Sequence, residues 1–120
     1  MDDNGHLRVR GSFDLHMLGC ESFFNRLGFD EDYRAHNGLT IFSLDDRLTY
    51  VDEVRDGEHV TVHVCATSAS DSVVRGRSAI VNQMRRAVAS VLYFVDASAG
   101  LHSRRLEPFA DPLAGEFRPP

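Results

Sequence analysis

The sequence contains no tryptophan, only two cysteines, and no apolar run long enough to span a bilayer. The two cysteines, Cys20 and Cys65, fit neither a disulfide framework nor a zinc site, so both are expected to be buried thiols in a reducing compartment. Residues 1–12 are polar and charged, unlike a secretory signal peptide. We therefore expect a cytoplasmic protein with no membrane partner.

Positive charge is also in short supply. Lys and Arg total 13 against 18 Asp and Glu, and the formal net charge is −5. No basic stripe is present, which argues against a nucleic-acid partner. A small anionic ligand needs only a local group of arginines, so the net charge does not exclude binding of such a ligand. With 42% hydrophobic and 26% charged residues, the 120-residue chain is predicted to form one globular domain.

Proline is absent from the first hundred residues, and all four prolines fall within residues 101–120. We expect an irregular surface segment there, because proline fits neither a helix interior nor a central strand. The predicted domain covers residues 1–112, followed by an irregular tail at 113–120. Internal repeats and low-complexity tracts are absent from the sequence.

A long amphipathic helix is predicted over residues 8–27, with Gly28 as its C-terminal stop. Its apolar positions recur at spacings of four and three: Phe13, Met17, Cys20, Phe24 and Leu27. Gly19 lowers helix propensity, which suggests close contact between this helix and a neighbouring segment.

After a short helical turn at 30–36, the hydrophobic period changes to two. Strands are predicted at residues 39–50, 60–67, 73–82 and 87–96. Phe42, Leu44, Leu48 and Tyr50 are expected to share one face of the first of these strands. One long helix followed by consecutive antiparallel strands predicts an α+β fold, with the helix packed on one face of the sheet.

The residues just ahead of the long helix could form a catalytic arrangement. Asp2 offers a carboxylate that can activate water or attack a carbonyl, and backbone N–H groups at Gly5 and His6 can hold an oxyanion. Asn4 is predicted to cap the helix or to contact a substrate. His6 either orients this segment or lies on the surface. His59 and His63 have no further ligand nearby in the sequence, so they are expected to be ordinary strand residues and no metal site is predicted.

Four segments then follow one another in a single register. Residues 2–7 read Asp-Asp-Asn-Gly-His-Leu, residues 26–30 read Arg-Leu-Gly-Phe-Asp, residues 41–58 contain Tyr50 and end Glu-Val-Arg-Asp-Gly-Glu, and residues 93–96 read Tyr-Phe-Val-Asp. In this register the chain resembles the hotdog-fold acyl-CoA thioesterases of the 4-hydroxybenzoyl-CoA thioesterase superfamily. Within them it is most similar to the betainyl-CoA thioesterase-like domains of carnitine metabolism.

The resemblance implies a hotdog fold, in which a curved antiparallel sheet packs around a long central helix. It implies hydrolysis of the thioester of a small, polar acyl group, with Asp2 as the catalytic carboxylate and Gly5 and His6 at the oxyanion site. Asn4 is then a substrate-binding residue. No cofactor is expected beyond the coenzyme A of the substrate. The family also implies a homodimer or homotetramer with the active site between protomers.

Two arginines are candidates for binding the phosphates of coenzyme A. Arg75 and Arg77 lie two residues apart on one predicted strand and so share a face. Exposed charges on a sheet are equally compatible with no binding role.

The chain also departs from the family pattern. Arg8, Val9 and Ser12 stand where family members commonly have an Asn pair and a Tyr, and the strand that usually precedes the Asp motif is expected to be missing. These differences favour a second interpretation, a non-catalytic hotdog domain that binds acyl-CoA or serves in dimerisation. A third, a dehydratase or isomerase of related architecture, would use His6 as its catalytic histidine.

Overall fold

The computed structural model describes residues 9–109, with side chains from residue 11 onward. Two helices and four strands follow in chain order: α1 (Val9–Arg26), α2 (Glu31–Asn37), β1 (Leu39–Tyr50), β2 (Val60–Ala69), β3 (Val73–Asn82) and β4 (Ala87–Gly100). The predicted α+β composition and the order of its elements are confirmed. The last strand runs four residues beyond its predicted end.

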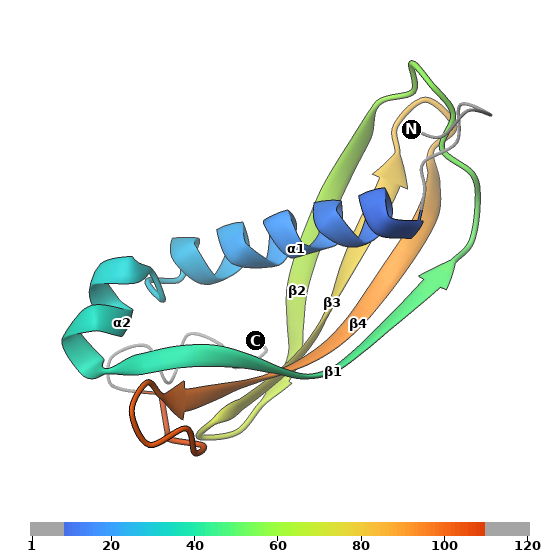
Figure 1. Cartoon of the computed structure of the whole chain (residues 1–120). Helices are drawn as coiled ribbons and strands as arrows, with labels where there is room; N and C mark the ends of the chain where they lie inside the picture. The colour runs from blue at the N-terminus through green and yellow to red at the C-terminus, as the bar shows by residue number, and fades with distance from the viewer. Residues whose placement is uncertain (1–8, 110–120) are drawn as a thin grey trace.

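The four strands form one antiparallel sheet in the order β1-β4-β3-β2. The sheet is strongly curved, and α1 lies across its concave face; neither of the two described helices covers the other face (Figure 1). β4 is central, paired with β1 from Leu39↔Gly100 to Tyr50↔Ser90 and with β3 on its other side. This is the hotdog architecture that the sequence predicted.

α1 turns a mixed polar and apolar stripe toward the sheet. Its buried residues fall at every fourth position: Ser12, His16, Cys20 and Phe24. The predicted apolar stripe is therefore offset, since Phe13, Met17 and Leu27 are only partly buried at its margin. His16 and Ser12 replace two of the expected apolar contacts.

Gly19 lets α1 approach β2 closely, as its position in the helix suggested. A Cβ atom at Gly19 would lie 2.6 Å from Cγ1 of Val62 and 3.3 Å from Cγ2 of Val64. The inward residues of β2 are the predicted valines, and its outward residues are polar or exposed. Cys65 is among the exposed ones, so the expectation that both cysteines are buried is wrong for Cys65 and correct for Cys20.

An aromatic cluster closes the far end of the fold. Phe29, which follows α1, packs edge-on against Phe24 and Phe109, with ring centroids 6.2 Å and 5.8 Å away. Phe94 of β4 completes the cluster and is 1% exposed. Phe109 is itself 4% exposed, so the segment after β4 is anchored in the core rather than lying wholly on the surface as predicted.

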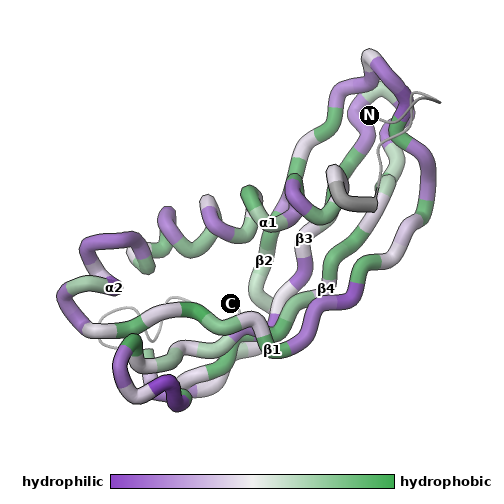
Figure 2. Tube along the Cα trace, viewed as in Figure 1, coloured by the Kyte–Doolittle hydropathy of each residue, from purple (hydrophilic) through white to green (hydrophobic). Residues whose placement is uncertain are grey.

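α2 is short and mainly hydrophilic (Figure 2), and none of its residues is buried. The carboxylate of Asp30 caps it by accepting from the N–H of Tyr33 at 2.9 Å, and Gly38 ends it in the left-handed region at φ 62°. No helix within residues 9–109 is both long and apolar enough to cross a membrane.

β1 contains a bulge that changes which residues face α1. The register slips between Ser43 and Asp45, so Leu44 is unpaired and 51% exposed. Before the bulge the odd-numbered residues point inward, whereas after it the even-numbered ones do. The prediction that Phe42, Leu44, Leu48 and Tyr50 share one face is therefore wrong as a whole. Leu48 and Tyr50 do share the inward face after the bulge, but the alternation does not continue through residue 44.

Candidate functional site

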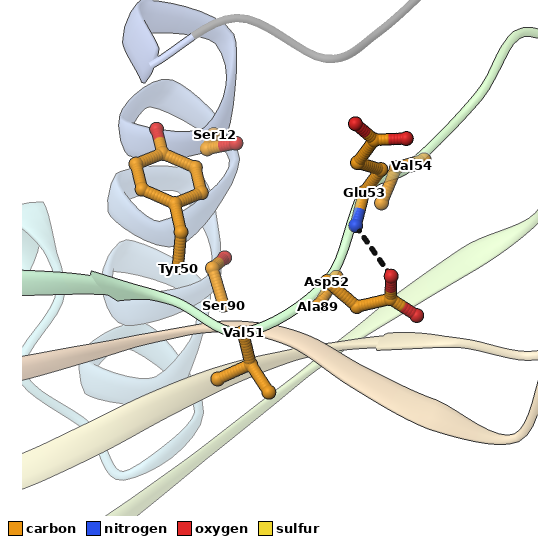
Figure 3. A pocket seen from close by; sticks show the side chains of 8 residues that line it. All are labelled: Ser12, Tyr50, Val51, Asp52, Glu53, Val54, Ala89 and Ser90. Atoms are coloured by element: carbon orange, nitrogen blue, oxygen red, sulfur yellow. Dashed lines mark hydrogen bonds between the residues drawn. The ribbon is translucent and has the colours of Figure 1, made fainter.

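A hollow of about 430 Å³ opens beside the first turns of α1, where β1 ends and the chain leaves the sheet (Figure 3). It is bounded by α1, by the segment after β1 and by β4. Its lining residues are Ser12, Tyr50, Val51, Asp52, Glu53, Val54, Ala89 and Ser90. Hydroxyl and carboxylate groups thus meet a smaller set of apolar side chains in one concave surface.

Backbone hydrogen bonds to β4 shape this hollow. The N–H groups of Val51 and Asp52 both donate to the carbonyl oxygen of Ala89, at 2.8 and 3.0 Å. The Oδ1 of Asp52 in turn accepts from the N–H of Glu53 at 2.8 Å, which turns the chain away from the sheet. Val54 then returns to the core and is 4% exposed. The wall of the hollow is therefore a fixed turn rather than a free loop.

Ion pairs tie this wall to the β3–β4 turn. Arg85 lies 3.5 Å from Oδ1 of Asp52 and 2.9 Å from Oε2 of Glu58. The N–H of Arg55 donates to Glu58 at 2.7 Å; this bond first, and Arg85 in addition, hold the pKa of Glu58 below its usual value. These partly exposed pairs place the positive charge of Arg85 beside the carboxylates of Asp52 and Glu58.

Below the hollow lies a buried histidine held by two serines. Nδ1 of His16 is 2.7 Å from Oγ of Ser78 on β3, and its Nε2 is 2.9 Å from Oγ of Ser90 on β4. His16 is completely buried, and burial lowers its pKa from 6.5 to about 4. The imidazole is therefore neutral near pH 7. Through Ser90, which lines the hollow, this polar group reaches the surface of the pocket.

A second hollow of about 220 Å³ lies between the C-terminal half of α1 and β1, and it contains Asp96 and Cys20. Burial, and secondarily the charge of Asp46, raises the pKa of Asp96 from 3.8 to about 6. Burial, followed by the charges of these two carboxylates, raises the pKa of Cys20 to about 12. The Ser43 hydroxyl donates to Oδ2 of Asp46 at 2.7 Å and lies 3.4 Å from Oδ1 of Asp96.

The bulge in β1 brings this acidic pair together. Ser43 precedes the bulge and Asp46 follows it, yet both side chains reach toward Asp96 on β4. A regular strand would place residues 43 and 46 on opposite faces. Asp96 belongs to the Tyr-Phe-Val-Asp segment, but nothing in that segment reveals that its side chain is buried beside another carboxylate.

Family comparison assigns the chain as a whole. A model of the thioesterase-like superfamily matches residues 1–117. The chain belongs to the thioesterase-like superfamily. No curated protein matches it.

Solved structures with the same fold as this thioesterase-like chain are similar over nearly all of its length. A hypothetical protein from Staphylococcus aureus, solved in complex with CoA, has a TM-score of 0.92 and 17% identity, covering 100% of this chain and 79% of the other. A 1,4-dihydroxy-2-naphthoyl-CoA thioesterase from Synechocystis has a TM-score of 0.83 and 13% identity, covering 98% and 86%. A gentisyl-coenzyme A thioesterase has a TM-score of 0.79 and 13% identity, covering 97% and 89%. At these identities the likeness shows a shared fold.

The sequence-predicted site residues are only partly placed by this thioesterase-like structure. Asp2, Asn4, Gly5 and His6 lie outside the described residues, and their roles stay predictions. Ser12 does line the hollow beside α1. Across residues 9–109, no group of three or more His, Cys, Asp or Glu side chains could hold a metal ion.

Arg75 and Arg77 lie on the face of the sheet opposite α1. Both are exposed and alternate with residues that are buried beneath the helix. Arg75 lines a shallow hollow of about 470 Å³ with Arg47, Asp45, Tyr93 and two further residues. The structure therefore separates both arginines from the hollow at Ser12, and their contact with coenzyme A phosphates stays a prediction.

The sequence reasoning missed His16, Ser78 and Ser90. A signal was present, because His16 lies four residues from both Ser12 and Cys20 and hence on the same helix face. Ser78 and Ser90 likewise occupy inward positions of their strands. Polar residues at inward positions of two strands and a helix indicate a buried hydrogen-bonded group.

Proposed function

We propose that this thioesterase-like protein hydrolyses the thioester of a small, polar acyl-CoA. The observation that carries the proposal is the hydroxyl-lined hollow beside the first turns of α1 in a chain of this superfamily. The 1,4-dihydroxy-2-naphthoyl-CoA and gentisyl-coenzyme A thioesterases that share its fold support coenzyme A as the thiol carrier. The fold neighbour in complex with CoA supports the same ligand class.

In the proposed reaction, Asp2 removes a proton from the attacking water, or it attacks the thioester carbonyl directly and forms an anhydride that water then hydrolyses. The tetrahedral oxyanion is stabilised by backbone N–H groups at Gly5 and His6, and coenzyme A leaves as the thiol after gaining a proton. Asn4 contacts the substrate. These roles rest on the register of the Asp-Asp-Asn-Gly-His segment and on its position just ahead of α1 in the sequence.

The lining of the hollow supports an uncharged, polar acyl group. Asp52, Glu53 and the Tyr50 hydroxyl contribute to it, and none of the eight lining residues within the described part of the chain is a Lys or Arg. An acyl group bearing its own carboxylate would be desolvated there without a counterion, which is costly. The kinship with betainyl-CoA thioesterase-like domains is a separate proposal that rests on the sequence register.

The active unit is proposed to be a homodimer or homotetramer in the cytoplasm. β1 is an edge strand of the described sheet, and Leu44, Tyr50 and Val51 on or next to it are 46–63% exposed. An exposed edge with apolar side chains is a common site of strand pairing between chains. A monomer measured by light scattering at micromolar concentration would contradict this assembly.

A second candidate function is a non-catalytic domain that binds acyl-CoA. Ser12, in the position where the resembling family commonly carries a Tyr, is 2% exposed and lines the hollow. The loss of a ring there enlarges the space available to a ligand while removing one phenolic hydroxyl.

The test compares coenzyme A release by the wild type with release by Asp2→Ala across a panel of acyl-CoA thioesters. Loss of a catalytic acid or base typically lowers the rate about 100- to 10,000-fold. Asp3→Ala is the matched control, since it removes a neighbouring carboxylate without a proposed role. Equal rates for the wild type and Asp2→Ala would exclude Asp2 as the catalytic residue. Binding of acyl-CoA without any thiol release would favour the non-catalytic domain.

A further inference from the structure

Ser78, His16 and Ser90 form a chain of hydrogen bonds, here called the relay, that runs from the core to the hollow. The serines come from adjacent strands, with Ser78 opposite Leu92 and Ser90 opposite Ile80 in the β3–β4 register. Ser78 and His16 are completely buried, and Ser90 is 2% exposed. Only Ser90 lines the hollow, where it also pairs across the sheet with Tyr50.

The number of protons available determines which groups of the relay donate a hydrogen bond and which accept one. A neutral imidazole has one N–H donor and one acceptor nitrogen, so it accepts from one serine and donates to the other. Within the described residues, His16 is the only hydrogen-bond partner of the Ser78 hydroxyl. A buried hydroxyl proton without an acceptor is unfavourable. The favoured arrangement therefore has Ser78 donating to Nδ1 and Nε2–H donating to Ser90.

In this arrangement the hydroxyl proton of Ser90 is not used by the relay. Its oxygen accepts from Nε2 of His16, which lies on α1, and its position at the hollow is seen in Figure 3. We infer that His16 is a positioning residue that holds Ser90 as a hydrogen-bond donor to the acyl group of the substrate. Ser90 is then a specificity-determining residue for acyl groups that carry an acceptor oxygen, such as a hydroxyl or a ketone.

This inference rests on the proposed function and makes its substrate class narrower. An unsubstituted alkyl chain leaves the Ser90 donor without a partner in the occupied hollow, and so does a trimethylammonium group, which has no acceptor atom. A 3-hydroxyacyl or 3-oxoacyl group satisfies it. The preferred acyl group is thus one bearing an oxygen a few atoms from the thioester.

Ser90 does not have the surroundings of a nucleophile. A serine–histidine pair attacks efficiently when a third group stabilises the imidazolium that forms, a role that a carboxylate usually fills. The other nitrogen of His16 contacts the hydroxyl of Ser78 instead, and burial opposes protonation of the ring. Both features suit a fixed neutral donor, and neither suits a general base.

Binding of two coenzyme A thioethers to the full-length protein tests the role of Ser90. S-(3-hydroxybutyl)-CoA and S-butyl-CoA differ by one hydroxyl and lack the thioester carbonyl. The wild type is expected to bind the hydroxylated compound about tenfold more tightly, the effect of one well-made neutral hydrogen bond. Ser90→Ala is expected to abolish this preference. Ser78→Ala, which does not touch the hollow, is expected to reduce this preference, because the His16 ring then lacks the hydroxyl that donates to Nδ1.

Ser98→Ala is the matched control, because Ser98 is also a completely buried serine of β4 and its hydroxyl has no hydrogen-bond partner among residues 9–109. This variant should keep the tenfold preference. Equal affinity of the wild type for both thioethers, or an unchanged preference in Ser90→Ala, would overturn the inference alone. Failure to bind either compound would instead contradict coenzyme A as the ligand.

Nitrogen-15 NMR of the histidine rings tests the direction of the relay without any ligand. The chain has six histidines, and the His16 signals are identified by their loss in His16→Gln or, if that variant does not fold, by their shift in Ser90→Ala. The expected result is the tautomer with the proton on Nε2, and it holds whether or not the protein turns over acyl-CoA. A proton on Nδ1 would mean that the Ser90 hydroxyl donates to Nε2 of His16 and is not available to a ligand, and the inference would be wrong.

Discussion

Replacing Asp96 by Asn is expected to stabilise the protein increasingly from about pH 4 to about pH 6, with the full effect above about pH 6. Asp96 is 8% exposed, and its nearest hydrogen-bonding partner, the Ser43 hydroxyl, already donates to Asp46. Burial and the Asp46 charge therefore disfavour the carboxylate and raise its pKa from 3.8 to about 6. Asn preserves the shape of the side chain and cannot become charged.

The sign follows from the direction of this pKa change. Because the folded protein binds the Asp96 proton more tightly than the unfolded chain, Asp96 imposes no ionisation penalty below about pH 4 and its full penalty above about pH 6. The pKa rises from 3.8 to about 6, which corresponds to about 3 kcal/mol at about 1.4 kcal/mol per pH unit. Asp96→Asn should therefore raise the free energy of unfolding by up to about 3 kcal/mol at pH 8 and by much less near pH 4.

Urea denaturation of the wild type and Asp96→Asn at both pH values measures this difference. Asp45→Asn is the matched control, because Asp45 follows the bulge in the same strand but its side chain is 54% exposed and pairs with Arg47 at 3.4 Å. The control should change the unfolding free energy by less than about 0.5 kcal/mol, as surface substitutions usually do. A destabilisation by Asp96→Asn that is equal at both pH values would refute the electrostatic reasoning.

Two further predictions concern packing and thiol reactivity. Gly19→Ala should lower the unfolding free energy by about 1–2 kcal/mol, because overpacking against Val62 outweighs the gain in helix propensity. Adding Val62→Ala to this variant should recover part of the loss. Calorimetry of both single variants and the double variant measures the three unfolding free energies, and additive losses would contradict direct contact between the two residues. A thiol reagent at about pH 8 should modify Cys65 rapidly and Cys20 only after unfolding, since burial raises the pKa of Cys20 to about 12; rapid modification of both thiols in the folded protein would contradict this.

The strand plan could be predicted because the period-two pattern coincides with burial. The valines of β2 face α1, as their alternation indicated, and β3 has the predicted bounds. β4 runs further, to Gly100, because Ala97, Ser98 and Ala99 pair with β1 despite their low strand propensity. Pairing with a neighbouring strand overrides local propensity, and a single sequence does not show that neighbour.

The bulge at Leu44 and the buried relay could not be predicted from the spacing of apolar residues, for a similar reason. The alternation of apolar residues predicts that Leu44 faces inward. In the structure Leu44 lies in a bulge, and the bulge places Ser43 and Asp46 near Asp96. Hydrophobic spacing likewise does not identify His16, because it predicts only apolar residues on the buried face of a helix. Both features depend on polar partners at least fifty residues away in the sequence.

The most direct test of the central claim is the steady-state release of coenzyme A from 3-hydroxybutyryl-CoA by the purified, full-length wild-type protein. The proposed function predicts thiol release by the wild type well above the uncatalysed rate. Asp2→Ala should release the thiol at least about 100-fold more slowly, and Asp3→Ala should match the wild type. No release above background from this substrate or from any other member of an acyl-CoA panel would contradict it.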